Sequence, residues 1–217
     1  MDYIFYDVFK GGKTLDDAPL ALLREETEFA WDSTYKGETT RFFPLITDDQ
    51  NKINGAVVHW KGIGNPEQAD HLRQEVPWIK HGFSDGRVIP IGNFVSVSKL
   101  FDQGGKFRRC EPVQRLRPFS TDPCVTWYAI LVAKDASSYD SIYGVRDALH
   151  CVRLWKGGIA EEVFDVVHQQ QGKVLRLKAN DREEVKRYVA EIPSLSEGAA
   201  DVEILRTKSQ MAWEVLF

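Results

Sequence analysis

The sequence predicts an α+β fold, a mixed β-sheet with helices packed on it, and three observations favour this prediction. Segments rich in aromatic and β-branched residues alternate along the chain with segments of helical periodicity. The chain has 217 residues, of which 43% are hydrophobic, so it can bury a core of its own. We find no low-complexity segment and no internal repeat, which argues against disordered and solenoid proteins.

A joint between Pro118 and Pro123 predicts two lobes. We expect an N-terminal α+β lobe over residues 1–118, which carries a basic loop at 99–118, and a C-terminal α/β lobe over residues 124–217. One compact domain stays open as the alternative.

The first elements of the N-terminal lobe are a strand and a helix. Residues 3–9 are aromatic and β-branched, as strands are. Thr14-Leu-Asp-Asp17 is a capping pattern that predicts a helix running to about Trp31. Residues 32–55 mix Thr, Asp, Asn and Gly around the apolar plug Phe42-Phe-Pro-Leu-Ile46, so we expect a long loop held by that plug.

The rest of this lobe reads as a strand, a helix and two more strands. Residues 56–60 predict a buried strand, and a helix begins at Pro66, where proline suits the first turn, and ends before Pro77. Residues 87–91 and 93–99 predict strands that lead into the basic loop.

The second lobe is expected to surround a central strand at 126–132, which is apolar on both faces. Asn180-Asp-Arg-Glu183 resembles a capping box ahead of a helix. The other expected elements are helices at 138–150 and 159–170 and strands at 173–178, 202–206 and 211–217.

Composition places the chain among soluble cytoplasmic proteins. Its longest apolar run is too short for a membrane span, and its N-terminus lacks the features of a signal peptide. Three cysteines at irregular spacing suit a reducing compartment. The histidines and cysteines form no metal-ligand motif, and no complete cofactor motif is present, so we expect neither a metal nor a cofactor.

The basic loop is the strongest candidate site. Residues 99–118 carry a local charge of +4 against a chain total of −4. Arginine pairs with phosphate bidentately, and an aromatic ring can stack on a base. The candidate residues for a nucleic acid, a nucleotide, another polyanion or an acidic protein are Lys106, Phe107, Arg108, Arg109, Arg115 and Arg117. The alternative is that these cations pair with the chain's own carboxylates.

An acyltransferase is the first enzymatic alternative. A glycine turn with Gly158 and Ala160, a helix, a strand and a second helix from Asp181 resemble the acyl-CoA-binding half of the GNAT N-acetyltransferases. In that family the backbone N–H groups at the helix start hold the CoA pyrophosphate. Here Trp155 stands at the first position of the motif, and Glu161 and Glu162 follow the turn.

An NAD-consuming transferase is the second enzymatic alternative. His59 follows a strand and precedes Trp60, which is similar to the strand-borne histidine that grips NAD in ADP-ribosyltransferases. Glu161 or Glu162 would then supply the catalytic carboxylate. Whether the chain is an enzyme, which residues would be catalytic, and its oligomeric state are left open.

Overall fold

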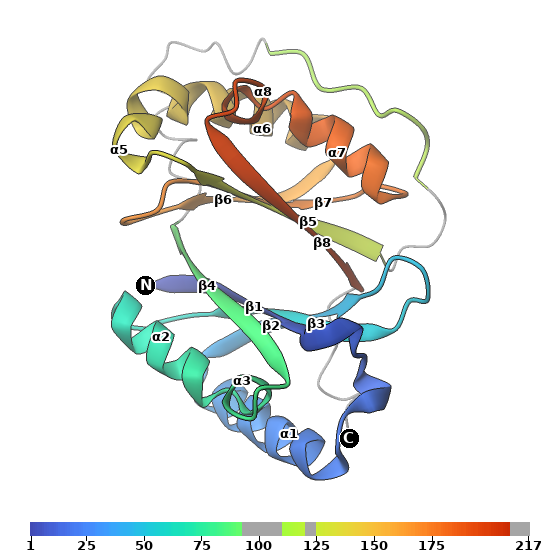
Figure 1. Ribbon diagram of the computed structural model, residues 1–217. Helices are drawn as coiled ribbons and strands as arrows, with labels where there is room; N and C mark the ends of the chain where they lie inside the picture. Colours follow the sequence, from blue (N-terminus) through green and yellow to red (C-terminus); the bar gives the residue numbers. More distant parts are fainter. Residues whose placement is uncertain (93–109, 120–124, 209–217) are drawn as a thin grey trace. The chain divides into compact units, whose positions relative to one another are not determined.

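A computed structural model describes residues 1–92, 110–119 and 125–208 of the chain (Figure 1). The chain divides into two compact units, one of Met1–Ile91 with Thr207–Phe217 and one of Gly92–Arg206. We call them unit 1 and unit 2. The predicted lobe bounds, 1–118 and 124–217, stay a prediction. The strands expected at 93–99 and 211–217 lie outside the described residues.

The α+β class is confirmed in both units, and every strand pair of known register is antiparallel. In each unit the helices cover one face of the strands (Figure 1). None of the helices in the described ranges is long and apolar enough to cross a bilayer.

Unit 1 has the strand order β4-β1-β3-β2. Its elements are β1 (Asp2–Phe9), α1 (Leu20–Tyr35), β2 (Thr39–Ile46), β3 (Ile53–Trp60), α2 (Pro66–Glu75), α3 (Pro77–Lys80) and β4 (Ser84–Gly92). Alternate residues of β1 face the helices, and Phe5 stacks on Trp60 with ring centroids 4.5 Å apart.

Two expectations for unit 1 are corrected. The predicted loop contains strand β2, which pairs with β3 from Thr39 to Ile46. Turn-forming residues and Pro44 hide this strand in the sequence, because pairing with β3 and with Thr207 of the same unit stabilises it and local propensity does not. The capping box of Thr14 and Asp17 is present, but it begins a short 3₁₀ turn and not the long helix, which starts at Leu20.

Unit 2 has the strand order β8-β5-β7-β6. Its elements are β5 (Val125–Ala133), α5 (Ala136–Tyr139), a π-helical turn (Asp140–Gly144), α6 (Val145–Lys156), β6 (Ala160–Val166), β7 (Gly172–Leu177), α7 (Arg182–Ala190), α8 (Pro193–Ser196) and β8 (Ala200–Lys208).

The helix expected at 159–170 is wrong, because this segment forms strand β6. Glu161 and Glu162 suggest the acidic first turn of a helix. In the structure they form ion pairs with Arg176 of β7 and with Lys178, which follows it. The two acids therefore face cations from the neighbouring strand segment.

The two units repeat one topology, β-α-β-β-α-β, which is that of ferredoxin-like folds. The repeat extends to single glycines. Gly55 has φ 153° and Gly172 has φ 152°, and a Cβ atom on either would lie 2.0 Å from a carbonyl oxygen, that of Asp7 or that of Leu131. Both positions therefore require glycine.

The short helices α3 and α8 repeat one another as well. Each begins with proline, and the backbone N–H that follows this proline donates to a carboxylate on the long helix of its unit. Trp78 donates to Glu26 over 3.3 Å, and Ser194 donates to Asp147 over 3.0 Å. Glu26 on α1 and Asp147 on α6 are therefore equivalent positions.

The ends of the long helices agree with this alignment. The amide of Glu38 donates to the Ser33 carbonyl, and the amide of Ile159 donates to the Leu154 carbonyl. The spacing from Glu26 to Ser33 equals that from Asp147 to Leu154, so α1 and α6 align residue by residue. No repeat is visible in the sequence, because the two copies share backbone geometry and few side chains.

Candidate functional site

The described part of the predicted basic loop lies on helices α6 and α7. We call residues 110–119 the strap. Its backbone meets α6 where the amide of Val113 donates to the Arg153 carbonyl and where Arg153 donates to the Glu111 carbonyl. Lys106, Phe107, Arg108 and Arg109 lie outside the described residues.

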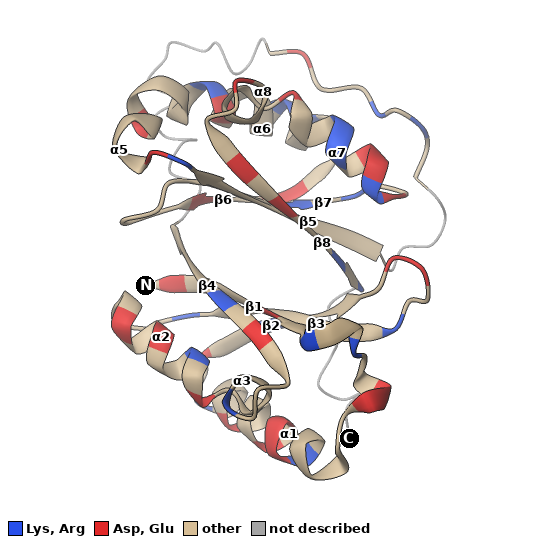
Figure 2. Cartoon of the chain, in the orientation of Figure 1, with Lys and Arg blue, Asp and Glu red and all other residues tan. Residues whose placement is uncertain are grey.

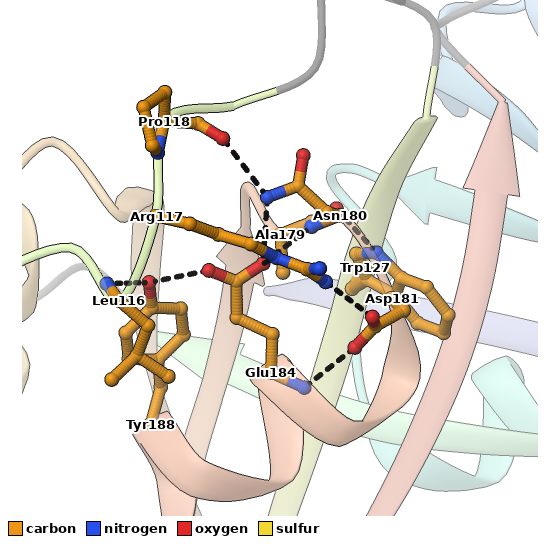
Figure 3. Close-up of polar contacts among 9 residues, drawn as sticks. All are labelled: Leu116, Arg117, Pro118, Trp127, Ala179, Asn180, Asp181, Glu184 and Tyr188. Carbon is orange, nitrogen blue, oxygen red and sulfur yellow. Dashed lines mark hydrogen bonds and ion pairs between the residues drawn. The ribbon is translucent and has the colours of Figure 1, made fainter.

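Both described candidate arginines make contacts within unit 2. Arg115 donates to the Gly157 carbonyl over 3.1 Å and lies over the ring of Phe119. Arg117 forms ion pairs with Asp181 and Glu184 on α7 (Figure 3). For Arg117, the alternative of pairing with the chain's own carboxylates therefore describes the structure.

A network around Glu184 holds the strap in place (Figure 3). Glu184 is buried, and its carboxylate accepts hydrogen bonds from the Asn180 amide over 2.8 Å and from the Tyr188 hydroxyl over 3.0 Å. The Tyr188 hydroxyl in turn accepts a hydrogen bond from the Leu116 amide over 3.1 Å. Each buried polar group here has a partner, which is the condition under which such a network stabilises a fold.

The N-terminus of α7 explains the charge of Asp181. Its carboxylate caps the helix by accepting the Glu184 amide over 2.8 Å. This backbone bond, and after it the Arg117 guanidinium, hold the pKa of Asp181 below its ordinary value. The Asp181 carboxyl is therefore ionised at neutral pH, and its charge is available to pair with Arg117.

A hollow of about 180 Å³ opens beside this network. It is lined by Leu116, Arg117, Asp181, Glu183, Glu184 and Arg187. Three carboxylates face two guanidinium groups, and Figure 2 shows both signs of charge along α7. Such a mixed surface does not favour a polyanion.

A second polar group of residues lies inside unit 2, beneath the π-helical turn. Asp147 is fully buried and accepts the Tyr139 hydroxyl over 2.7 Å. Lys173 is also buried and pairs with Asp165 across β7 and β6. The signal in the sequence was a lysine and two aspartates at positions that face the core, and it was missed.

Cys151 lies near the charged side chains of Asp147, Asp165 and Lys173, and its thiol is unreactive. It is fully buried, and burial raises the pKa of its thiol to about 12, although Lys173 acts in the opposite direction. The thiol stays protonated at neutral pH and is a poor nucleophile.

The apolar side chains inside the described part of unit 2 are closely packed. Side chains from β5, α6 and β7 meet in one cluster with no surface accessible to water, among them Ala129, Leu131, Leu154, Leu175 and Leu177. A side chain with zero accessible area has no water-sized void beside it. The space between α6 and these strands is therefore filled by protein atoms.

Two buried histidines contact neighbouring groups. In unit 2, His150 on α6 is buried, and its Nε2 atom lies 3.3 Å from the Tyr188 carbonyl oxygen. Burial lowers the pKa of His150, so the imidazole is neutral. In unit 1, the buried ring of His59 lies 5.7 Å from the ring of Phe43. Within the described residues no cluster of His, Cys, Asp or Glu could hold a metal ion.

Comparisons with known proteins place the fold. No family model matches the chain, and no curated protein matches it by sequence. Among solved structures, a mutant chlorite dismutase from Candidatus Nitrospira defluvii matches with a TM-score of 0.53 and 7% identity, over 99% of this chain and 93% of that one.

Two further structures extend the comparison. A putative chlorite dismutase matches with a TM-score of 0.53 and 11% identity, over 98% of this chain and 95% of that one. A haem-binding protein from Thermus thermophilus matches with a TM-score of 0.47 and 11% identity, over 99% of this chain and 93% of that one. The likeness to the chlorite dismutases shows a shared fold.

The nucleic-acid prediction is wrong, because the structural neighbours are chlorite dismutases and not nucleic-acid-binding proteins. The contacts of the two described arginines agree with the comparison. Arg115 and Arg117 contact Gly157, Asp181 and Glu184 of the same unit.

The acyltransferase alternative is overturned by the same neighbours. The turn at Gly158 leads into strand β6 and not into a helix, so no helix N-terminus follows this turn to face a pyrophosphate. The ADP-ribosyltransferase alternative fails with it, because Glu161 and Glu162, its candidate carboxylates, are paired with Arg176.

Proposed function

We propose that this chain uses the chlorite dismutase fold without haem and that it contacts a partner protein through the exposed aromatic side chains Trp31 and Tyr35 of α1. Haem is the group that this fold family implies, so the first question is whether the residues present fit it. The haem-free part of the proposal rests on one observation, the close packing of the described residues inside unit 2.

A haem needs a large apolar slot and an axial ligand. Ligand pockets of this kind measure roughly 300–1,000 Å³. In unit 2 the space between α6 and the strands is filled by side chains such as Leu131, Leu154 and Leu175, which have no accessible surface. The described residues of this space do not fit the group.

The possible axial ligands of a haem iron also argue against haem binding in unit 2. A neutral imidazole and a thiolate are among the axial ligands of haem iron. Burial raises the pKa of Cys151 to about 12, which keeps the thiol protonated, and the contact of His150 Nε2 with the Tyr188 carbonyl leaves only Nδ1 of that ring for a metal. A fold hosts many functions, so the shared architecture does not require shared chemistry.

Haem binding through His150 is the second candidate, and one observation favours it besides the fold. An imidazole that ligates a metal commonly donates its other ring N–H to a backbone carbonyl. His150 is neutral and has such a partner in Tyr188. The two candidates predict opposite results in one titration.

The test is a haem titration of the purified chain, followed by Soret absorbance and thermal unfolding. We expect no saturable 1:1 Soret band and an unchanged Tm. A specific ligand at about 100 times its Kd would add about 2.7 kcal/mol of stability, which thermal unfolding detects.

Two variants complete this test. His150→Ala removes the candidate ligand, and His168→Ala removes an exposed histidine of the same unit as the control. Weak absorbance shared by all three proteins supports the proposal. A 1:1 Soret band that His168→Ala keeps and His150→Ala loses would overturn it in favour of haem binding.

A cytoplasmic location is part of the proposal. It is supported by the odd number of cysteines and by Cys151, which forms no disulfide. Labelling of Cys151 in denaturant without prior reduction, in protein taken directly from cells, is the expected result.

A further inference from the structure

The outer face of α1 carries exposed aromatic rings. Trp31 is 51% exposed and Tyr35 is 86% exposed, and the two lie one helical turn apart. Glu28 and Asp32 are exposed beside them, and within the described residues neither forms an ion pair. Large aromatic groups at the surface, flanked by charge, are typical of protein interaction sites.

The repeat within the chain shows what such a face can hold. Because Glu26 aligns with Asp147, the positions of Trp31, Asp32 and Tyr35 on α1 are those of Val152, Arg153 and Lys156 on α6. The comparison needs only the internal geometry of each unit.

On α6 these positions bind the strap. Val152 packs against Cys110, and Lys156 donates to the Cys110 carbonyl over 2.7 Å. Arg153 donates to the Glu111 carbonyl over 3.1 Å and accepts the Val113 amide over 3.0 Å. In unit 2, this face of the long helix therefore binds an extended chain segment.

On α1 one of these positions carries the opposite charge, and the lysine position holds a neutral tyrosine. Arg153 and Lys156 are hydrogen-bond donors, whereas Asp32 is an acceptor in the position of Arg153. A segment on α1 must therefore supply the donors. Lysine and arginine satisfy a carboxylate, and they also stack favourably over tryptophan and tyrosine rings. Figure 2 marks acidic positions along α1.

We infer that the outer face of α1 binds an extended segment of a partner protein that carries lysine or arginine. The inference rests on the proposed protein-contact role and names its site and its partner chemistry. Asp32 and Glu28 receive the cations, and Trp31 and Tyr35 supply the apolar contact.

The probe is a labelled peptide with the sequence of residues 108–117, which carries four arginines and one glutamate, synthesised with Cys110→Ser. We expect saturable, salt-sensitive binding to the full chain, measured by fluorescence anisotropy. The control peptide has glutamate in place of each arginine and is expected not to bind.

Variants locate the site. Asp32→Ala and Trp31→Ala should each weaken binding about tenfold, which is about 1.4 kcal/mol. Glu67→Ala, an exposed acid on α2, is the matched control and should bind as the unchanged chain does. Equal affinity in all variants, or no binding at about 1 mM peptide, where the binding free energy is only about 4 kcal/mol, overturns the inference.

Self-association is the competing occupant of this face. Sedimentation that shows a dimer lost on Trp31→Ala would replace the partner segment with a second copy of the chain and so overturn the inference. The haem titration is independent of this result. A peptide that does not bind would leave the proposal of a haem-free fold unaffected. A specific Soret band would refute that proposal but would not bear on peptide binding at α1.

Discussion

Asp147 accepts the backbone N–H of Ser194 over 3.0 Å while its other oxygen accepts the Tyr139 hydroxyl over 2.7 Å. The carboxylate is fully buried, and it joins α6 to α5 and α8. Because the acid at the same place in unit 1 is Glu26, this contact is part of the repeated design of both units.

We expect Asp147→Asn to destabilise the chain by about 1–3 kcal/mol, because the amide nitrogen cannot accept one of the two hydrogen bonds. Urea unfolding measures the loss. Tyr139→Phe is the control, since it removes a donor and leaves the Ser194 contact in place, and it should cost less. Equal costs for the two variants would contradict this account.

Lys173 and Asp165 form a buried ion pair, with side-chain exposures of 3% and 14%. Removing one member of such a pair leaves an uncompensated charge, so Lys173→Met should cost roughly 3–5 kcal/mol. Adding Asp165→Leu removes that charge and should restore most of the loss. A double variant no more stable than the single one would show that the pair is not coupled.

Asp7 makes the stability of unit 1 depend on pH. Burial raises the pKa of its carboxyl to about 6, and the Ala56 amide only partly offsets this effect. The folded pKa lies above the unfolded value, so this contribution is present below about pH 4 and is lost as the pH rises through about 6.

Asp7→Asn should therefore raise the free energy of unfolding at about pH 8 by on the order of 2 kcal/mol, with little change at about pH 4. The asparagine oxygen can still accept the Ala56 amide. Chemical unfolding at both pH values measures the difference between variant and unchanged chain. A gain of the same size at the lower pH would refute the titration of Asp7 as its cause.

Arg117 fixes the strap to α7. Its guanidinium is half exposed, so Arg117→Ala should change global stability by no more than about 1 kcal/mol. Its local effect is larger, because two strap contacts on Asp181 and Glu184 disappear. We expect faster limited proteolysis within residues 110–119.

The control for this variant is Arg187→Ala, which changes an arginine that lines the same hollow and forms no ion pair within the described residues. Its cleavage pattern should match that of the unchanged chain. Equal acceleration in both variants would mean that the hollow, and not the Arg117 contacts, protects the strap.

Several elements could be predicted because each carries its own signal. Strands β1 and β5 contain aromatic or continuous apolar residues, and α2 and α7 begin with proline or with a side-chain cap. Strand β2 was missed, because its turn-like residues become a strand through pairing with neighbouring strands. Strand β6 was mistaken for a helix, because its acids pair with Arg176 and Lys178 of the neighbouring strand segment, which local sequence does not show.

For the candidate site, too, the sequence predicted individual residues but not their partners. The sequence shows that Arg117 is a cation in a basic segment, but not that Asp181, 64 residues away, neutralises it. Lys173 stands out as a lysine in an apolar strand, whereas its pairing with Asp165 follows from the register of β6 and β7.

Residues close together in the chain were enough to predict the α+β class, the periodicity of the clearest elements and the position of the charges. The repeated topology, the close packing of the described residues inside unit 2 and the pairing of Arg117 became known from the folded chain alone. Those properties depend on contacts between residues that are distant in the sequence. Local propensity does not determine which strand pairs with which, or which carboxylate pairs with Arg117.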